Sequence, residues 1–456
     1  MKNFSSQHWP SSLIYYCSLI FVGVITFACS TPGVVQKASI VLKGGAIYTI
    51  SPDQPQVEAV ALRDSIIIFA GLEKDLENYI GAETKVFDLN GKILTPGWIE
   101  GHGHFMGLGY SELNLDLSNT KSFDEIIEKV KASTNKTPAG NWIIGRGWHQ
   151  SKWTSQPQEI INGFPIHQAL STKSPDHPVV LFHASGHALF ANAKAMEIAG
   201  IGPLNQELGG KREITGGEVI RDRNGNPTGI FNENAMDLIS KHIPESSDEN
   251  DLLAFNLAQE ACLRNGITSF HDAGVGRETL AFYQKMEASG KLKIRMYAML
   301  NGNDNALLKE WYEKGPKTDS WLSIRSIKLS ADGALGSRGA WLLEEYSDRH
   351  GHYGHETIPM EMVFKTAINS IKYGFQLATH AIGDRANREV LDQYEKALSE
   401  KNALNADHRF RIEHAQHLHP DDIPRFASLG VIPSMQAIHL SSDRPWAIDR
   451  LGADRI

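Results

Sequence analysis

The second half of the chain repeats one order of apolar and polar positions. Each repeat has an amphipathic helix-like run, then a glycine suited to end a helix, then a short apolar run typical of a buried strand. The paired runs cover residues 251–264 and 267–271, 278–288 and 292–300, 360–372 and 375–380, and 424–428 and 431–435. Repeated βα units indicate a parallel sheet, and this many predict an α/β fold of the (β/α)8 TIM-barrel type. Catalytic residues in such barrels lie at the C-terminal ends of the strands.

The pattern between residues 38 and 89 is different. Short apolar segments alternate with turn signals such as Gly44-Gly45 and Asn90-Gly91, and no helix-like run separates them. We therefore expect a small antiparallel sheet of four or five strands. Its apolar face must pack on something, because a lone sheet of this size would leave that face open.

Residues 141–239 fit no simple βα unit, and we interpret them as a lid-like insertion over the barrel mouth. Two strand-like runs, 141–146 and 179–183, are followed by the loop signals Gly209-Gly210 and Gly216-Gly217. The aromatic and imidazole side chains of this region could shape a substrate pocket. The alternative is a packed lid whose aromatic side chains are buried. The residues concerned are Trp148, His149, Trp153, His183 and His187.

The first 35 residues are expected to be a targeting leader and linker. An apolar run at 13–28 is short for a membrane span and suits the hydrophobic region of a secretory signal. The run ends at Ala28-Cys29, which resembles a bacterial lipoprotein box with Cys29 as the lipidated residue, although Thr26 stands where Leu is usual. We expect an exported lipoprotein attached to the membrane through Cys29. The alternatives are an uncleaved anchor or an ordinary signal peptide, which would give a periplasmic or secreted protein.

The composition limits the number of domains, the kinds of partner and the use of disulfides. The chain has 456 residues, of which 41% are hydrophobic, enough for one large domain and a smaller one. The formal net charge of −8 offers no basic surface for nucleic acid, so we expect a small-molecule substrate and no membrane contact beyond the lipid anchor. Three cysteines, two of them in the leader, cannot form a disulfide framework.

Two histidines, His102 and His104, follow the apolar run 92–94 with one glycine between them. On an extended backbone their side chains point to the same side and could bind one metal ion. Gly101 and Gly103 leave room for an ion close to the backbone. The alternative is a pair of histidines at a strand end without a ligand role.

Three later strand ends also carry polar side chains. Residues 326–332 alternate strictly, so Lys328 and Asp332 share the polar side that should line the barrel mouth, while His380 and His414 end two further strands. A lysine in a barrel mouth is costly unless it is paired, neutral or modified, and a CO₂ adduct (a carbamate) could bridge two cations. The alternatives are an ion pair of Lys328 with Asp332 or Asp384, and ordinary core hydrogen bonds for the histidines. Because parallel strands bring their C-terminal ends to one rim, we expect His102, His104, Lys328, His380 and His414 to converge on a common point.

Several motifs together resemble one family. They are the segments 95–104 (TPGWIEGHGH), 327–338 (IKLSADGALGSR), 380–386 (HAIGDRA) and 411–414 (RIEH), with less specific matches at 147–148, 185–187 and 227–233. From about residue 40 to 456 the chain resembles the amidohydrolase superfamily, and most closely its amidohydrolase-3 branch of YtcJ-like and N-substituted-formamide-deformylase-like proteins.

The resemblance implies a metal-dependent hydrolase of amide-like, non-peptide C–N bonds that acts through metal-activated water. It implies one or two divalent ions, with Zn²⁺ expected, bound by His102, His104, His380 and His414, and Lys328 as a bridging or nearby ligand that can be carboxylated. It also implies a small β-sandwich, to which residues 36–95 contribute one part, beside a barrel at 96–456. We assign Trp148, His187, Asp332 and Asp384 to substrate binding.

The resemblance ends with one departure. Family members continue into a last strand that ends in a Gly-Ser-Asp-like motif, whose Asp is the usual metal ligand and general base, and this position would lie beyond Ile456. We therefore expect a barrel without its last strand and sandwich half, from a fragment or an inactive natural product, and assign no catalytic residue. Asp443 follows the preceding strand too closely for that role. Two other functions stay open: a non-catalytic lipoprotein that binds a small molecule, and a phosphoester hydrolase on the same barrel.

Overall fold

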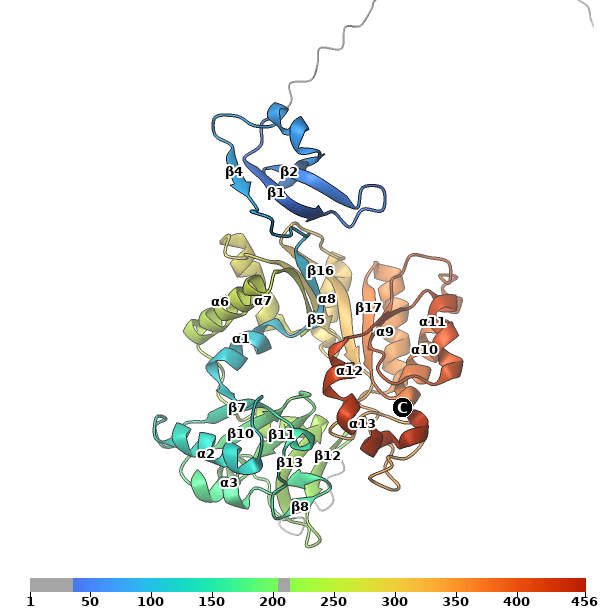
Figure 1. The fold of residues 1–456 in the computed structure, drawn as a ribbon. Coiled ribbons are helices and arrows are strands. Elements are labelled where there is room, and N and C mark those ends of the chain that lie inside the picture. The colour runs from blue at the N-terminus through green and yellow to red at the C-terminus, as the bar shows by residue number, and fades with distance from the viewer. Residues whose placement is uncertain (1–35, 204–213) are drawn as a thin grey trace, which may run out of the picture. The chain divides into compact units, whose positions relative to one another are not determined.

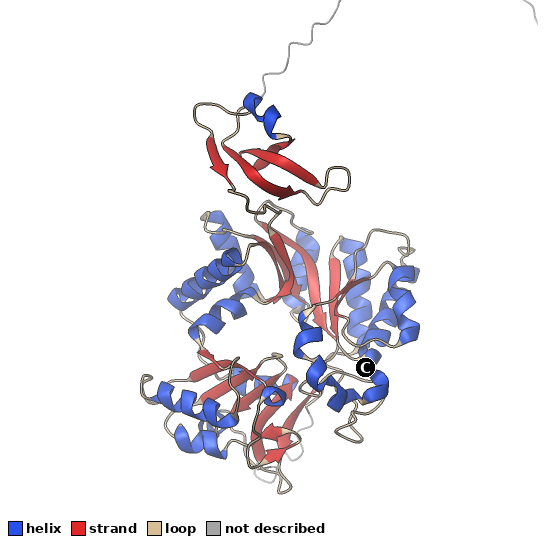
Figure 2. Cartoon of the chain, in the orientation of Figure 1, coloured by secondary structure: helices blue, strands red, loops and turns tan. Residues whose placement is uncertain are grey.

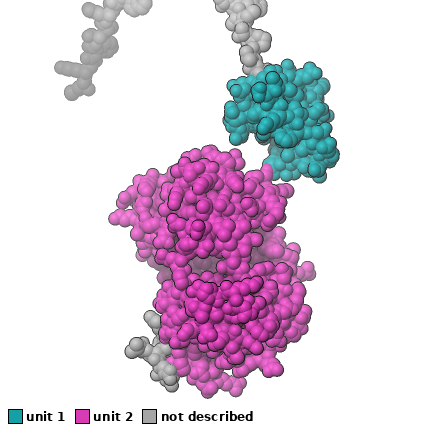
Figure 3. Space-filling view, turned by 90° about the vertical axis from the view of Figure 1, so that its left-hand side faces the viewer, with its two compact units in different colours: residues 1–96 teal, residues 97–456 magenta. Residues whose placement is uncertain are grey.

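The computed structural model describes residues 36–203 and 214–456. The predicted leader with Cys29, and the Gly209-Gly210 loop, lie outside the described residues. The chain divides into two compact units, residues 1–96 and 97–456, coloured separately in Figure 3. No helix in the described part is long and apolar enough to cross a membrane.

Unit 1 contains a single four-stranded sheet with the order β3-β2-β1-β4. Its elements are β1 (Ile40–Tyr48), β2 (Gln56–Arg63), β3 (Ile66–Gly71), the 3-10 helix η1 (Glu73–Asn78) and β4 (Lys85–Asp88). The prediction of an antiparallel sheet is wrong for β4, which pairs with β1 in parallel, Ile40 opposite Lys85. The reason is that η1 carries the chain back to the end at which β1 began, so β4 enters in the same direction. Within the described residues this unit is one sheet, whereas a sandwich needs two.

Unit 2 contains a seven-stranded parallel sheet with the order β19-β18-β17-β16-β15-β14-β5, which curls into a nearly closed barrel. Figure 2 shows the strands flanked by helices. The strands are β5 (Trp98–Gly103), β14 (Ile267–Val275), β15 (Arg295–Asn301), β16 (Leu322–Ser330), β17 (Gln376–Ala381), β18 (Arg411–His414) and β19 (Ile432–Ser434). The helices are α1 (Phe105–Leu113), α6 (Asp248–Arg264), α7 (Arg277–Ala288), α8 (Asn305–Lys314), α9 (Met360–Tyr373), α10 (Asp384–Glu400), α11 (Ile423–Leu429), α12 (Ile438–Ser442) and α13 (Arg444–Leu451).

The four predicted helix–strand repeats are confirmed as α6–β14, α7–β15, α9–β17 and α11–β19. Gly374 and Gly430 end α9 and α11 with φ of +78° and +65°, a left-handed conformation that only glycine adopts without strain. The predicted strand at 326–332 is β16, which begins four residues earlier and ends at Ser330.

Residues 115–233 form a second sheet, of six strands, with the order β12-β13-β11-β10-β7-β6. Figure 1 shows these strands together, with α2 and α3 against them. The strands are β6 (Leu115–Asp116), β7 (Ile143–Trp148), β10 (Val179–His183), β11 (Ala188–Ala191), β12 (Gly217–Arg221) and β13 (Pro227–Glu233). The helices are α2 (Phe123–Thr134), α3 (Gln168–Lys173), α4 (Ala193–Ile198) and α5 (Asp237–Ser240), and β8 (Ile160–Ile161) pairs with β9 (Phe164–Pro165). This sheet therefore starts ahead of the predicted insertion at 141 and has cores of its own.

Candidate metal centre

His102 near the end of β5 lies against Glu413 on β18, although these strands are far apart in the order of the sheet. The Nδ1 of His102 makes a short hydrogen bond with Oε2 of Glu413, and the Glu413 side chain is fully buried. This contact requires the sheet to curl until β5 and β18 meet, so it is direct evidence of barrel curvature.

Arg411 holds Glu413 from the other side. Its Nε donates to Oε1 (2.6 Å) and its Nη2 to Oε2 (2.8 Å), and Nη2 also reaches the carbonyl of Gly101 and the hydroxyl of Ser434, both at 2.8 Å. Burial alone would raise the pKa of Glu413, but the hydrogen bonds from His102 and Arg411 bring it down to about 2. The carboxylate is therefore ionised and fixes both the position and the tautomer of His102.

His104 stands where β5 passes into α1. Its Nδ1 donates to the carbonyl of Ala273 on β14 (3.0 Å), which leaves Nε2 with its lone pair. The next residue, Phe105, donates its backbone N–H to Asp272 (3.0 Å), and Tyr283 donates its hydroxyl to the same carboxylate (2.6 Å). Asp272 thus anchors the first turn of α1 and with it the direction of His104.

His380 and His414 complete a row of imidazoles along this rim. Ring centres are 5.8 Å apart between His104 and His102, 4.6 Å between His102 and His414, and 4.5 Å between His414 and His380. His414 has a φ of +72°, and its Nδ1 faces Oε1 of Gln436 (2.9 Å). Two imidazoles on one tetrahedral zinc ion have ring centres about 5 Å apart, so the neighbouring pairs have suitable spacing.

The convergence of the five predicted site side chains on one common point stays a prediction. In residues 36–203 and 214–456, no group of three or more His, Cys, Asp or Glu side chains is placed to hold a single ion. The rings follow one another in the order His104, His102, His414, His380. Three of them have a hydrogen-bond partner at Nδ1, which is Glu413 for His102, Ala273 for His104 and Gln436 for His414. Nε2 of His380 instead lies 3.4 Å from the carbonyl oxygen of Gly333 and 3.3 Å from Oδ1 of Asp332.

The chemistry of the donors nevertheless fits a divalent metal. Burial lowers the pKa of all four imidazoles, that of His104 to about 3, so they are neutral at pH 7. In His102, His104 and His414 the Nδ1 atom is occupied, which leaves Nε2 for a ligand, the usual arrangement around a bound metal. Such nitrogen donors suit Zn²⁺.

Lys328 lies on β16, opposite Ala378 of β17 and two residues before the position opposite His380. Its ammonium group has no hydrogen bond or ion pair within the part of the chain that the structure describes, so neither of the alternative ion pairs, with Asp332 or Asp384, forms. Burial lowers its pKa to about 8. Lys328 therefore lies one layer deeper than His380 with its nitrogen uncommitted.

His187 comes from the six-stranded sheet and meets the same row. Its ring centre is 4.9 Å from that of His380, and its Nδ1 bonds Oε2 of Glu233 at 2.7 Å. Although burial lowers the pKa of His187, the charge and the hydrogen bond of Glu233 raise it above its usual value. A Cβ on Gly333 or Gly339 would collide with the Glu233 carboxylate, so glycine at both positions permits this close packing.

A cavity of about 350 Å³ opens onto this end of the row. Its walls include His187, His380, His414, His439 and Asp443. Asp443, which has no predicted role, accepts a hydrogen bond from Gln416 at 2.9 Å. The cavity places three of the predicted site histidines around one space of substrate size.

The carboxylates of Asp332 and Asp384 accept hydrogen bonds from backbone N–H groups, which argues against the predicted contact with substrate. Asp332 is fully buried and accepts from the N–H groups of Ile382 (3.0 Å), Gly383 (2.8 Å) and Trp341 (2.9 Å). Asp384 accepts from the N–H of Leu343 at 2.9 Å. Both oxygens of Asp332 are used in this way, so we now interpret it as a positioning residue for the loops that follow β16 and β17.

Trp148 is also enclosed. It has no exposed surface, its indole N–H donates to the carbonyl of Leu181 (2.9 Å), and it packs on Trp153 and Phe164. This geometry favours the packed-lid alternative for Trp148 over a substrate contact. Of the other aromatic candidates, His183 is fully buried, whereas His149 lines the same cavity as His187.

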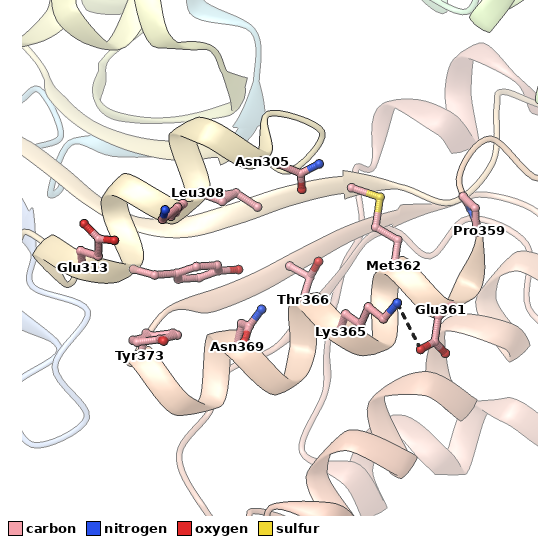
Figure 4. Close-up of a pocket in the computed structure, with 12 residues that line it drawn as sticks. Asn305, Leu308, Glu313, Pro359, Glu361, Met362, Lys365, Thr366, Asn369 and Tyr373 are labelled. Atoms are coloured by element: carbon pink, nitrogen blue, oxygen red, sulfur yellow. Dashed lines mark ion pairs between the residues drawn. The ribbon is translucent and has the colours of Figure 1, made fainter.

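Not every pocket belongs to this site. Figure 4 shows one between α8 and α9, lined by Leu308, Met362 and Tyr373, with Lys365 3.6 Å from Glu361. None of the predicted site residues lines it. Its position on the outer helices separates it from the strand ends.

Sequence reasoning missed three partners of the site: Glu413, Asp272 and Glu233. Glu413 lies inside the segment RIEH, where alternation with Arg411 puts both polar side chains on one side of β18. That alternation could have indicated an inward-facing pair. Nothing local connects Glu233 with His187, 46 residues earlier.

The sequence pattern of a family described as the amidohydrolase family matches residues 85–456. The chain belongs to the amidohydrolase family. It is 31% identical over 419 residues to the YtcJ protein of Bacillus subtilis (strain 168), covering 91% of this chain and 75% of that protein. It is 26% identical over 410 residues to the N-substituted formamide deformylase of Arthrobacter pascens, covering 87% of this chain and 72% of that protein.

A solved structure extends this similarity to the fold. An uncharacterized metal-dependent hydrolase from Pyrococcus horikoshii OT3 superimposes with a TM-score of 0.68 at 27% sequence identity, covering 91% of this chain and 78% of that one. The family membership predicted from the motifs is confirmed, as is an α/β barrel fold. This amidohydrolase family member therefore has metal-dependent hydrolases among its relatives.

Proposed function

We propose that this protein hydrolyses amide-like, non-peptide C–N bonds with the help of a bound divalent metal. The observation that carries the proposal is the row of neutral imidazoles at the C-terminal ends of β5, β17 and β18, in which His102, His104 and His414 have their Nδ1 atoms occupied and their Nε2 atoms available. Similarity to a formamide deformylase supports the choice of bond.

His102, His104, His380 and His414 would hold the metal, with Lys328 beneath them. When bound, a divalent ion, for which we propose Zn²⁺, supplies an activated water and polarises the carbonyl of the substrate. Since Lys328 has no partner among the described residues, we propose that its amine adds to CO₂, forming an N–C bond and releasing a proton to solvent. The resulting carbamate would lie close to two or more imidazoles.

The protein's own residues would prepare the site for this chemistry. Glu413 keeps His102 in one tautomer, and Ala273 does the same for His104. His187, held by Glu233, stands beside His380 on the wall of the cavity that would take the scissile group. Asp332 holds the loops that close this space from two sides.

We also propose that the seven strands belong to a (β/α)8 barrel. β5 and β19 are the two ends of the sheet order, and Arg411 contacts both Gly101 of β5 and Ser434 of β19. An eighth strand paired with both would complete the ladder.

We separately propose that residues 1–35 are a leader that directs export and lipidation at Cys29. The apolar run 13–28 is the reason for this proposal. Intact-mass analysis of membrane-extracted protein tests it. An unmodified Cys29, or cleavage at another position, would refute it.

The function is tested by metal analysis together with turnover. We expect the purified protein to contain zinc and to hydrolyse N-substituted formamides, and His102→Ala to lose both metal and activity. Glu361→Gln, at an exposed position of α9, is the matched control and should change neither. Metal-dependent cleavage of p-nitrophenyl phosphate with none of formamides would indicate a phosphoester hydrolase. Metal binding without any turnover would indicate a binding protein.

A further inference from the structure

Arg146 is a half-buried cation of the six-stranded sheet. It lies on β7, and within the described residues its guanidinium group makes no hydrogen bond, ion pair or ring contact. A guanidinium group has five donors and cannot lose its charge, so enclosing it without an acceptor is unfavourable. Such a group is a candidate to bind an anion.

The backbone conformation around Arg146 sets the direction of its side chain. Arg146 pairs with Phe182, but the next pair joins His183 to Trp148, so Gly147 is an extra residue in β7. Gly147 has a φ of +104°, which suits glycine alone. Bulges of this kind turn a side chain out of the regular ladder and are frequent beside functional sites.

Arg146 lines a large cavity of about 1140 Å³. The cavity lies between α1, the loop 243–247 and the six-stranded sheet, and Figure 3 shows unit 2 hollowed across its middle. Trp142 and Phe182 give it an apolar wall, Tyr110 and Asn250 add polar atoms, and Glu245 is the only carboxylate among the described residues that line it.

Two short distances relate this cavity to residues of the candidate site. Gly107 lines it, and a Cβ on Gly107 would lie 3.3 Å from the Cβ of His104. Nη2 of Arg146 would lie 3.4 Å from a Cβ on Gly186, the residue before His187.

We propose that Arg146 binds a carboxylate of the substrate, so that the enzyme acts on amides that carry a carboxylate beside an aromatic or alkyl group. The inference rests on the proposed C–N hydrolase function and adds the substrate class. The planar guanidinium matches a carboxylate through two parallel hydrogen bonds. A monoanion fits better than a dianionic phosphate, because the cavity offers one cation and also contains Glu245.

The test measures binding, so it does not depend on turnover. The probes are N-formyl-, N-acetyl- and N-benzoylglycine, each paired with its neutral primary amide, and inorganic phosphate is a further ligand. Affinities are measured by calorimetry for the wild-type protein, Arg146→Met, Arg146→Lys and the control Arg264→Met, whose side chain is exposed on α6. Thermal unfolding of each variant reports whether it is folded.

We expect at least one glycine carboxylate to bind the wild type more tightly than its amide. Arg146→Met should weaken that binding about 10- to 100-fold, as for the loss of hydrogen bonds to a charged group. Arg146→Lys should fall between, and neither the neutral amides nor Arg264→Met should show a change.

Three results would overturn the inference: no carboxylate preference in the wild type, an equal loss for carboxylates and amides in Arg146→Met, or tighter binding of phosphate than of every carboxylate. A protein that binds carboxylates through Arg146 but hydrolyses no amide would give a different result. It would support the carboxylate site and refute the proposed function.

Discussion

Glu413→Gln is the substitution that tests the architecture of the metal centre most directly. Glu413 is fully buried, receives two hydrogen bonds from Arg411 at 2.6 and 2.8 Å, and holds Nδ1 of His102. Glutamine keeps the size of the side chain and one carbonyl oxygen but removes the negative charge. The change therefore separates electrostatics from packing.

Glu413→Gln should lower both the stability of the fold and the affinity for metal. Removing one partner of a buried ion pair costs about 3–5 kcal/mol, and we expect the lower end, about 3 kcal/mol, because one oxygen can still accept from Arg411. A carboxylate that orients a metal-binding histidine typically contributes 10- to 100-fold to metal affinity, or about 1.4–2.7 kcal/mol. The first effect should appear in the metal-free protein and the second only in the metal-bound protein.

The assays are urea unfolding in the presence of a chelator and competition for zinc against a chromogenic dye. Glu310→Gln is the matched control, because Glu310 also contacts two cations, Arg277 and Lys314, but on the surface of α8. It should change neither quantity beyond experimental error. Unaltered zinc affinity in a destabilised Glu413→Gln would refute the view that Glu413 supports a metal ligand, and unaltered stability would refute the ion pair itself.

Three further predictions concern packing, loop anchoring and the metal. Trp148→Ala should lower the free energy of unfolding by about 3–5 kcal/mol, measured by urea denaturation, because a fully buried indole is removed; a fall in substrate affinity at unchanged stability would contradict its place in the core. Asp332→Asn should cost about 1–3 kcal/mol, since an amide cannot accept from all three backbone N–H groups, and a destabilisation no larger than that of an exposed Asp392→Asn would argue against the anchoring role. Removing the metal with 1,10-phenanthroline should abolish activity and lower the melting temperature, and Zn²⁺ should restore both; a stability difference of about 2.7 kcal/mol corresponds to free zinc at 100 times its dissociation constant. Full activity after complete metal removal would rule out the proposed chemistry.

Local periodicity determined a large part of the fold. The spacing of apolar residues in α6, α7 and α9, with the glycines after them, identified helices and strands within a few residues of their observed ends. It also marked His102, His104, Lys328, His380 and His414 as strand-end residues. Parallel strands must present these ends to one rim, so their common location followed from topology alone.

The sequence could not specify the partners of these residues. Glu413 meets His102 across 311 positions of the chain, and this contact exists only because the sheet curls. The direction of β4 likewise depends on where η1 ends relative to β1, and the turn signals in the sequence do not specify that position. The His102–Glu413 contact results from the closure of the barrel, and the direction of β4 results from how its strand pairs with β1. Both depend on many weak contacts between residues that are distant in sequence.

Burial was the other property that only the tertiary structure decided. Trp148 and Arg146 are two residues apart on β7, and the sequence singled out the tryptophan as the pocket residue. The bulge at Gly147 shifts the register between them, so that the indole enters the core and the guanidinium lines a cavity. A one-residue shift in a strand changes which side a residue faces, and only the pairing with β10 fixes it.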